Sequence, residues 1–130
     1  MSFNTYVDES VRDSFLLCGA NINQAMIPSI RDSLREMKPS DRSHIHMYRE
    51  RRSTQLAMAS FISTLPISCW LVSISTATAK EPLARPLALA ALTNIKSIQG
   101  SRLLTLDDTS ARRVDSQILR EVARSVEYQF

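Results

Sequence analysis

The sequence predicts an all-α protein, a small bundle of about four to six helices that forms a single helical domain over residues 1–130. Three observations favour this fold class. With only two Gly and five Pro, the chain lacks the turn signals that a β-sandwich or barrel needs roughly every 8–12 residues. These few Gly and Pro divide it into segments of helix length. Within several segments apolar residues recur every three or four positions, as on one helical face.

Two helices are expected before Pro39. The first covers residues 8–18 and is capped by Gly19, because apolar residues recur at helical spacing at Val7, Val11, Phe15 and Cys18. The second ends at Lys38-Pro39, and Pro28 marks either its start or a kink. Its apolar positions are Ile22, Met26, Ile30, Leu34 and Met37.

The remaining helices are expected between the later breaks. Ser40 and Asp41 can cap a long third helix that ends before Pro66, and a fourth apolar segment then runs to about Ala79. A fifth helix follows Pro82 and Pro86 and closes at Gly100. The last begins after residues 106–109, and its expected core stripe is Val114, Ile118, Val122 and Val126.

The net charge is only +3, but the type of basic residue is informative about possible binding partners. The chain has 13 Arg but only 3 Lys, and the planar guanidinium group of Arg makes paired hydrogen bonds with phosphate and carboxylate groups. This bias favours specific anion contacts or interfaces with ion pairs. The alternative is that it reflects the codon composition of the source genome.

The last expected helix carries most of the functional signal. A polar stripe of Arg113, Gln117, Arg120 and Arg124, spaced 4, 3 and 4 apart, lies beside the apolar stripe, and Arg112 adds a charge at the N-terminal end. Phosphate is the natural external partner of such a face. The alternative is a solvated face whose charges pair with Asp115, Glu121 and Glu127. The predicted nucleic-acid-binding residues are Arg112, Arg113, Gln117, Arg120 and Arg124.

The segment from Leu106 to Val122 resembles the coat proteins of rod-shaped plant viruses of the tobamovirus type. The likeness lies in an acidic and small-residue stretch that leads into Arg113-Val114-Asp115, with Ile118, Arg120 and Val122 beyond it. Residues 81–92 are loosely similar to the helix that precedes the inner loop in that family. The resemblance implies a four-helix bundle that stacks around single-stranded RNA, with Arg112, Arg113 and Asp115 in the RNA groove.

An uncharged stretch of 27 residues, Ser53 to Ala79, has two interpretations. It is long enough to span a bilayer, and Arg49, Arg51 and Arg52 precede it as flanking positive charges. Ten Ser or Thr residues and the central Pro66 favour instead two buried helices of a soluble bundle. The stretch can also pack against neighbouring subunits.

Signatures of catalysis, metal binding and cofactor binding are absent from the sequence. It contains no Gly-rich phosphate loop and no Cys-x-x-Cys or Gly-x-Ser-x-Gly motif. His44 and His46 would point apart on a helix, so they are not expected to share a metal ion. The sequence therefore predicts no catalytic residue and no metal ligand.

Cys18 and Cys69 are expected as buried thiols in a reducing compartment. No secretion signal is visible at the N-terminus, so a cytoplasmic location is expected.

Together these observations predict a non-enzymatic structural protein that self-associates and binds nucleic acid, with single-stranded RNA as the expected ligand, like a viral coat or nucleocapsid subunit. Two alternatives stay open at this point. One is a membrane-associated accessory protein anchored by residues 53–79. The other is a helical matrix or adaptor protein that binds other proteins.

Overall fold

The computed structural model describes residues 2–40, 43–75, 81–107, 111–122 and 126–130. The chain forms two compact units. One consists of Met1–Gln24 together with Ile67–Phe130, and the other of Ala25–Pro66. The larger unit holds every strand that the structure describes, and the smaller is a helical insertion between two of these strands.

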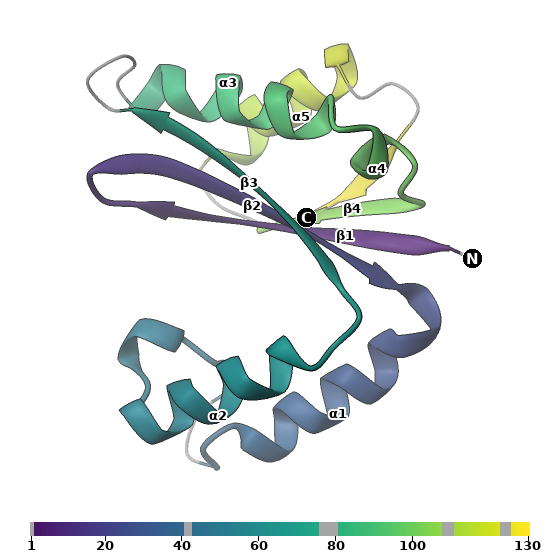
Figure 1. Cartoon of the computed structure of the whole chain (residues 1–130). Coiled ribbons are helices and arrows are strands. Elements are labelled where there is room, and N and C mark those ends of the chain that lie inside the picture. The colour runs from purple at the N-terminus through teal and green to yellow at the C-terminus, as the bar shows by residue number, and fades with distance from the viewer. Residues whose placement is uncertain (1, 41–42, 76–80, 108–110, 123–125) are drawn as a thin grey trace. The chain divides into compact units, whose positions relative to one another are not determined.

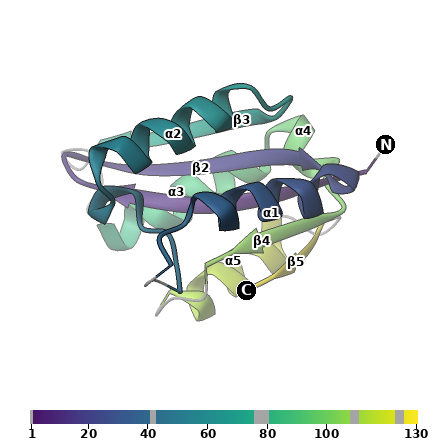
Figure 2. The ribbon, with the colours of Figure 1, turned by 90° about the horizontal axis from the view of Figure 1, so that it is seen from below.

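The larger unit is built on a mixed five-stranded sheet in the order β3-β2-β1-β4-β5. Antiparallel pairs join β1 (Phe3–Val11) to β2 (Ser14–Asn23) and β2 to β3 (Ser68–Ser75). Parallel pairs join β1 to β4 (Leu103–Leu106) and β4 to β5 (Glu127–Gln129). The strands succeed one another in this order across Figure 2. The prediction of an all-α bundle is therefore wrong.

Two helices cover one face of this sheet. Strands that run in the same direction need a crossover connection. The chain passes from β3 to β4 through α3 (Glu81–Thr93) and the short α4 (Lys96–Gln99). It passes from β4 to β5 through α5 (Arg112–Val122). Figure 1 shows α3 and α5 side by side above the strands. Among the described residues, no helix is long and apolar enough to cross a membrane.

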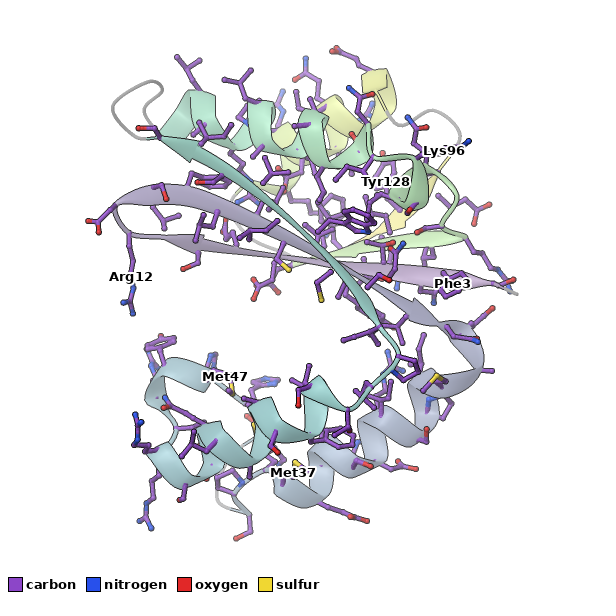
Figure 3. The ribbon with its side chains drawn as sticks, viewed as in Figure 1. Phe3, Arg12, Met37, Met47, Lys96 and Tyr128 are labelled. Atoms are coloured by element: carbon purple, nitrogen blue, oxygen red, sulfur yellow. The ribbon has the colours of Figure 1, made fainter. Side chains whose placement is uncertain are left out.

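The hydrophobic core lies between the sheet and these helices. Its fully buried side chains include Phe15 of β2, Leu92 of α3, Leu104 of β4 and Leu119 of α5. Tyr128, labelled in Figure 3, packs against this cluster from β5. At Gly19 the sheet approaches the helical layer closely, since an added Cβ would lie 3.3 Å from methyl groups of Leu92 and Ile98.

A hairpin replaces the first predicted helix. Residues 8–18 belong to β1, the turn at Arg12-Asp13 and β2, in the register Val7↔Gly19. Burial in β2 alternates with period two, at Phe15, Leu17, Gly19 and Asn21. The recurrence of apolar residues at helical spacing in this stretch is thus coincidental.

The smaller unit contains α1 (Ile27–Met37) and α2 (Arg52–Ser63). The second predicted helix is confirmed from Ile27 onward as α1, with Pro28 in its first turn and its C-cap at Lys38 before Pro39. Its first expected apolar position, Ile22, lies in β2, and Met26 is the N-cap. The third is shorter than expected, because a 3₁₀ turn at Met47–Arg49 precedes α2. Asp41, one of its predicted caps, lies outside the described residues.

The uncharged segment 53–79 forms one of the two expected helices and a strand, and its residues 76–79 lie outside the described residues. Its first part belongs to α2, Thr64 is the C-cap of that helix, and Ser68–Ser75 forms the edge strand β3. Trp70, Val72 and Ile74 pack against the core, and the residues between them are exposed. A membrane anchor formed by this segment as a single helix is therefore wrong.

Candidate active site

Acidic residues gather where two parallel strands, β1 and β4, run side by side. The register pairs Val7 with Leu106, so Asp8 and Glu9 follow on one strand and Asp107 follows on its neighbour. Both strands run in the same direction, and these carboxylates therefore occupy the same end of the sheet. Arg12, labelled in Figure 3, lies at the hairpin turn beyond this end.

The alternation of a strand directs Asp8 and Glu9 to opposite faces of the sheet. Glu9 shares its face with Thr5 and Val7, both buried, and therefore lies on the side of α3 and α5. Asp8 is exposed, and one of its carboxylate oxygens accepts a hydrogen bond of 2.8 Å from the backbone N–H of Glu9.

Arg85 of α3 links Glu9 to Asp115 of α5. Its Nε donates to Asp115 Oδ1 at 2.8 Å and its Nη2 to Asp115 Oδ2 at 2.7 Å, while its Nη1 donates to Glu9 Oε2. Asp115 thus accepts the paired, planar contact that guanidinium and carboxylate groups form best. A single cation ties the sheet to both helices that cover it.

Most of this cluster is shielded from solvent. The side chain of Asp115 is 1% exposed and that of Arg85 is 15% exposed, whereas Glu9 retains 29%. The hydrogen bonds donated to Asp115 raise the pKa of Arg85 above its already high ordinary value, although burial acts in the opposite direction. Arg85 consequently stays protonated and balances the charge of a carboxylate that water does not reach.

The remaining space at this end of the sheet is small. Val7, Asp8, Glu9, Leu17, Arg85, Leu106 and Asp107 line a pocket of about 10 Å³, which is roughly the volume one water molecule needs. Carboxylates are the ligands that Mg²⁺ prefers. Among the described residues, however, no three His, Cys, Asp or Glu side chains converge to hold a metal ion. Since the guanidinium of Arg85 is bonded to the carboxylates of both Glu9 and Asp115, a metal ion does not fit between them while Arg85 keeps this position.

The residues predicted to bind nucleic acid lie on the other side of α5. Arg113, Gln117 and Arg120 are exposed and line a shallow hollow together with Glu121. At 100° per residue, they lie opposite the buried Asp115. Arg112 is exposed and lies over the ring of Phe130, 5.1 Å from its centroid. Arg124 lies outside the described residues. Binding of nucleic acid by these residues stays a prediction.

The predicted core stripe of the last helix is partly wrong. Val114 is 44% exposed, whereas Asp115 and Leu119 are buried. The hypothesis that Asp115 serves the exposed Arg stripe is wrong for the same reason, because its carboxylate faces inward to Arg85. A buried carboxylate on an otherwise amphipathic helix is costly unless paired, so its partner had to come from another element.

The two cysteines lie on neighbouring strands. Cys69 is exposed and Cys18 is partly buried, so the expectation of two buried thiols is wrong for Cys69. In the register Cys18↔Leu71 and Ala20↔Cys69, they are diagonal neighbours on one face. Burial, followed by the proximity of Cys69 and Asp8, raises the pKa of the Cys18 thiol.

Sequence reasoning missed the cluster of Asp8, Glu9, Arg85 and Asp107. The signal lay in Leu103–Leu106, a short apolar run that ends in Asp107, which is the pattern of a buried strand followed by a polar strand end. Arg85 had no such signal, because two flanking prolines, Pro82 and Pro86, marked its segment as a break.

Comparisons with known proteins agree with this architecture. No family model and no curated protein matches the chain. The solved structure of the PCNA:RNase HII complex from Archaeoglobus fulgidus is similar, with a TM-score of 0.60 and 13% identity over 98% of this chain and 62% of that chain. A mutant of Bst-RNase HIII is similar with a TM-score of 0.52 and 11% identity, over 92% of this chain and 41% of that chain. The chain therefore shares the α/β fold of these two ribonucleases and spans less than two thirds of the length of each.

These findings correct the functional predictions. The interpretation as a non-enzymatic coat or nucleocapsid subunit, and the alternative of a helical matrix or adaptor protein, both rested on a helical bundle that the chain does not form. The structures that share its fold are of RNase HII and RNase HIII, which are enzymes, so the expectation of a structural protein without catalytic function is overturned. Self-association stays a prediction.

Proposed function

We propose that this chain is an enzyme that cleaves phosphodiester bonds in nucleic acid, with RNA as the first substrate class. The observation that carries this proposal is the parallel register Val7↔Leu106, which places Asp8, Glu9 and Asp107 at one end of the sheet. The fold shared with two ribonucleases supports it.

The exposed carboxylates suit the chemical step. Asp8 and Asp107 are open to solvent, and a carboxylate within hydrogen-bond reach of a water can accept its proton as the water attacks phosphorus. The P–O bond to the leaving sugar oxygen breaks in the same step, and solvent supplies the proton that this oxygen gains. Glu9 and Asp115 have a different role, because both are held by Arg85. They orient the guanidinium, which adds positive charge to the pocket that Asp8 and Asp107 also line.

The exposed face of α5 offers a contact for the rest of the substrate. Arg113 and Arg120 are exposed and line one hollow on this face. We assign this face to the phosphate backbone outside the cleaved bond. Replacement of both residues by Gln is expected to weaken binding of a single-stranded RNA 20-mer and to lower the slope of log K against log[salt] by about 1.4. Replacement of Arg31 and Arg35 on α1 is the matched control.

The direct test uses end-labelled single-stranded RNA, single-stranded DNA and an RNA–DNA hybrid, each incubated with the full chain in Mg²⁺, in Mn²⁺ and in chelator. Cleavage is expected to fall by about 10²-fold or more in Asp8→Asn and in Asp107→Asn, and to be unchanged in Asp32→Asn, an exposed carboxylate of α1. Intact substrates under every condition would contradict the proposal. Equal cleavage by Asp8→Asn and the wild type would contradict the role assigned to Asp8.

A further inference from the structure

The guanidinium of Arg85 supplies the positive charge that faces the carboxylates of Glu9 and Asp115. Arg85 of α3 bridges two other elements: its side chain donates to Glu9 of β1 and to Asp115 of α5. The pocket beside it is no larger than a water molecule. Nucleases that work at carboxylate clusters commonly use bound divalent ions. The chain instead fills this place with its own side chain.

We propose that Arg85 is the resident counter-cation of the site and that it competes with divalent metal ions for Glu9 and Asp115. The proposal concerns the site of the proposed function but does not require that function. Asp115 is 1% exposed, and a buried carboxylate needs a partner of opposite charge. A divalent ion can supply that charge only if the guanidinium leaves, because two cations at such short range repel each other strongly.

Competition predicts weak cation binding in the wild-type protein. Glu9 is the more exposed of the two partners, so its contact with Arg85 is the first to yield to an incoming ion. The bidentate contact with Asp115 then holds Arg85 at the edge of the site. Arg85 is therefore a positioning residue: while its guanidinium is bonded to Glu9 and Asp115, it prevents metal ions from binding to these two carboxylates.

The first experiment measures binding of Mg²⁺ and of Mn²⁺ to the folded chain by calorimetry, with no substrate present. Arg85→Gln keeps hydrogen-bond donors but removes the charge, and it is expected to bind each ion about tenfold tighter or more than the wild type. Arg35→Gln removes the same charge from an exposed pair on α1 and is expected to leave cation affinity unchanged.

A second pair of variants covers the case in which Arg85→Gln fails to fold because Asp115 lacks a partner. Asp115→Asn and the double variant Arg85→Gln/Asp115→Asn differ only at Arg85, in a background without the buried charge. The double variant is expected to bind Mn²⁺ more tightly. Equal affinity in both would overturn the competition, whatever the catalytic activity of the chain.

The third measurement follows Arg85 itself by NMR. Its Nε–H group donates to Asp115, and the corresponding signal is identified by its loss in Arg85→Lys. Saturation with Mg²⁺ is expected to shift or broaden that signal in the wild type. Tight Mg²⁺ binding with an unmoved Arg85 signal would contradict the proposal. Failure of the nuclease assay alone would not, since none of these readouts depends on cleavage.

Discussion

The guanidinium of Arg85 and the carboxylate of Asp115 form two parallel hydrogen bonds of 2.8 and 2.7 Å across the interface between α3 and α5. The two helices contact each other as well as covering the sheet. This pair is the polar centre of an otherwise apolar layer, which contains Ala84, Ala88 and Leu119. Loss of one charge of this pair and loss of both charges should therefore have very different effects on stability.

Arg85→Met is expected to lower the free energy of unfolding by about 3–5 kcal/mol, because it leaves Asp115 charged and buried without a partner. Arg85→Met/Asp115→Leu removes both charges and should restore most of that loss. Urea denaturation of the two single variants and the double variant measures the coupling energy. Additive losses in the double variant would show that the two residues do not depend on each other.

An exposed pair on α1 provides the contrast. Arg35 and Asp32 lie 3.4 Å apart, with side chains 72% and 71% exposed. Arg35→Met is expected to change stability by less than about 0.5 kcal/mol, since solvent screens such pairs.

The buried face of α5 can be tested by truncation. Leu119 is fully buried and Val114 is 44% exposed. Leu119→Ala is expected to cost about 2–5 kcal/mol through lost burial and a residual cavity, and Val114→Ala less than about 0.5 kcal/mol. Thermal and urea unfolding measure both. The opposite order would support the valine stripe that the sequence alone predicted.

Gly19 is needed for a close approach rather than for an unusual backbone angle. Its φ is not positive, but the Cβ of Gly19→Ala would press on Leu92 and Ile98 at 3.3 Å. We expect a loss of about 1–3 kcal/mol from overpacking. In Gly100→Ala the nearest atoms lie at 3.7 Å, so this variant should be neutral or slightly stabilising. Equal melting temperatures for both variants would contradict the tight contact.

The thiol of Cys18 makes stability depend on pH in the alkaline range. Burial and Cys69 raise its pKa in the folded protein, so the folded state holds the proton more tightly than the unfolded chain. This contribution is complete below the unfolded pKa of about 8.5 and is lost as pH rises through the folded pKa. Wild type should therefore lose more stability than Cys18→Ala between pH 7.5 and pH 10, as measured by urea unfolding.

Alkylation tests the same arrangement chemically. Because the thiolate is the reactive species, Cys18 should react with iodoacetamide more slowly at pH 8 than the exposed Cys69. Peptide mass spectrometry after short exposure distinguishes them. Equal rates at the two positions would show that Cys18 is neither shielded nor harder to ionise.

Helices proved more predictable from the sequence than strands, for reasons visible in particular residues. Helix α1 has Pro28 in its first turn and Lys38-Pro39 at its end, and both signals act locally. The inward face of β1 and β2 contains Thr5, Gly19 and Asn21 beside apolar residues, so the alternation of an ordinary strand was hidden. The turn at Arg12-Asp13 contains no Gly or Asn to mark a hairpin.

The site could not be predicted from local sequence patterns, because its residues come from segments that are far apart in the sequence. The apolar run Leu103–Leu106 with Asp107 behind it indicates a strand end, but its neighbour β1 lies at the other end of the chain. The pairing of Arg85 with Asp115 likewise joins two helices. The exposed Arg stripe was visible because it lies on one helix at fixed spacing, whereas the acidic cluster exists only after the sheet has formed.

The pairing of Asn4 with Leu103 also has a consequence for synthesis of the chain. During translation, β1 can join β2 as soon as both leave the ribosome, but its second edge has no ladder until Leu103–Leu106 emerges. For most of that time a central strand is an open edge, which is a template for pairing with other chains. A ribosome that pauses before residue 103 should therefore hold a nascent chain that needs a chaperone, even though the finished protein covers the same edge.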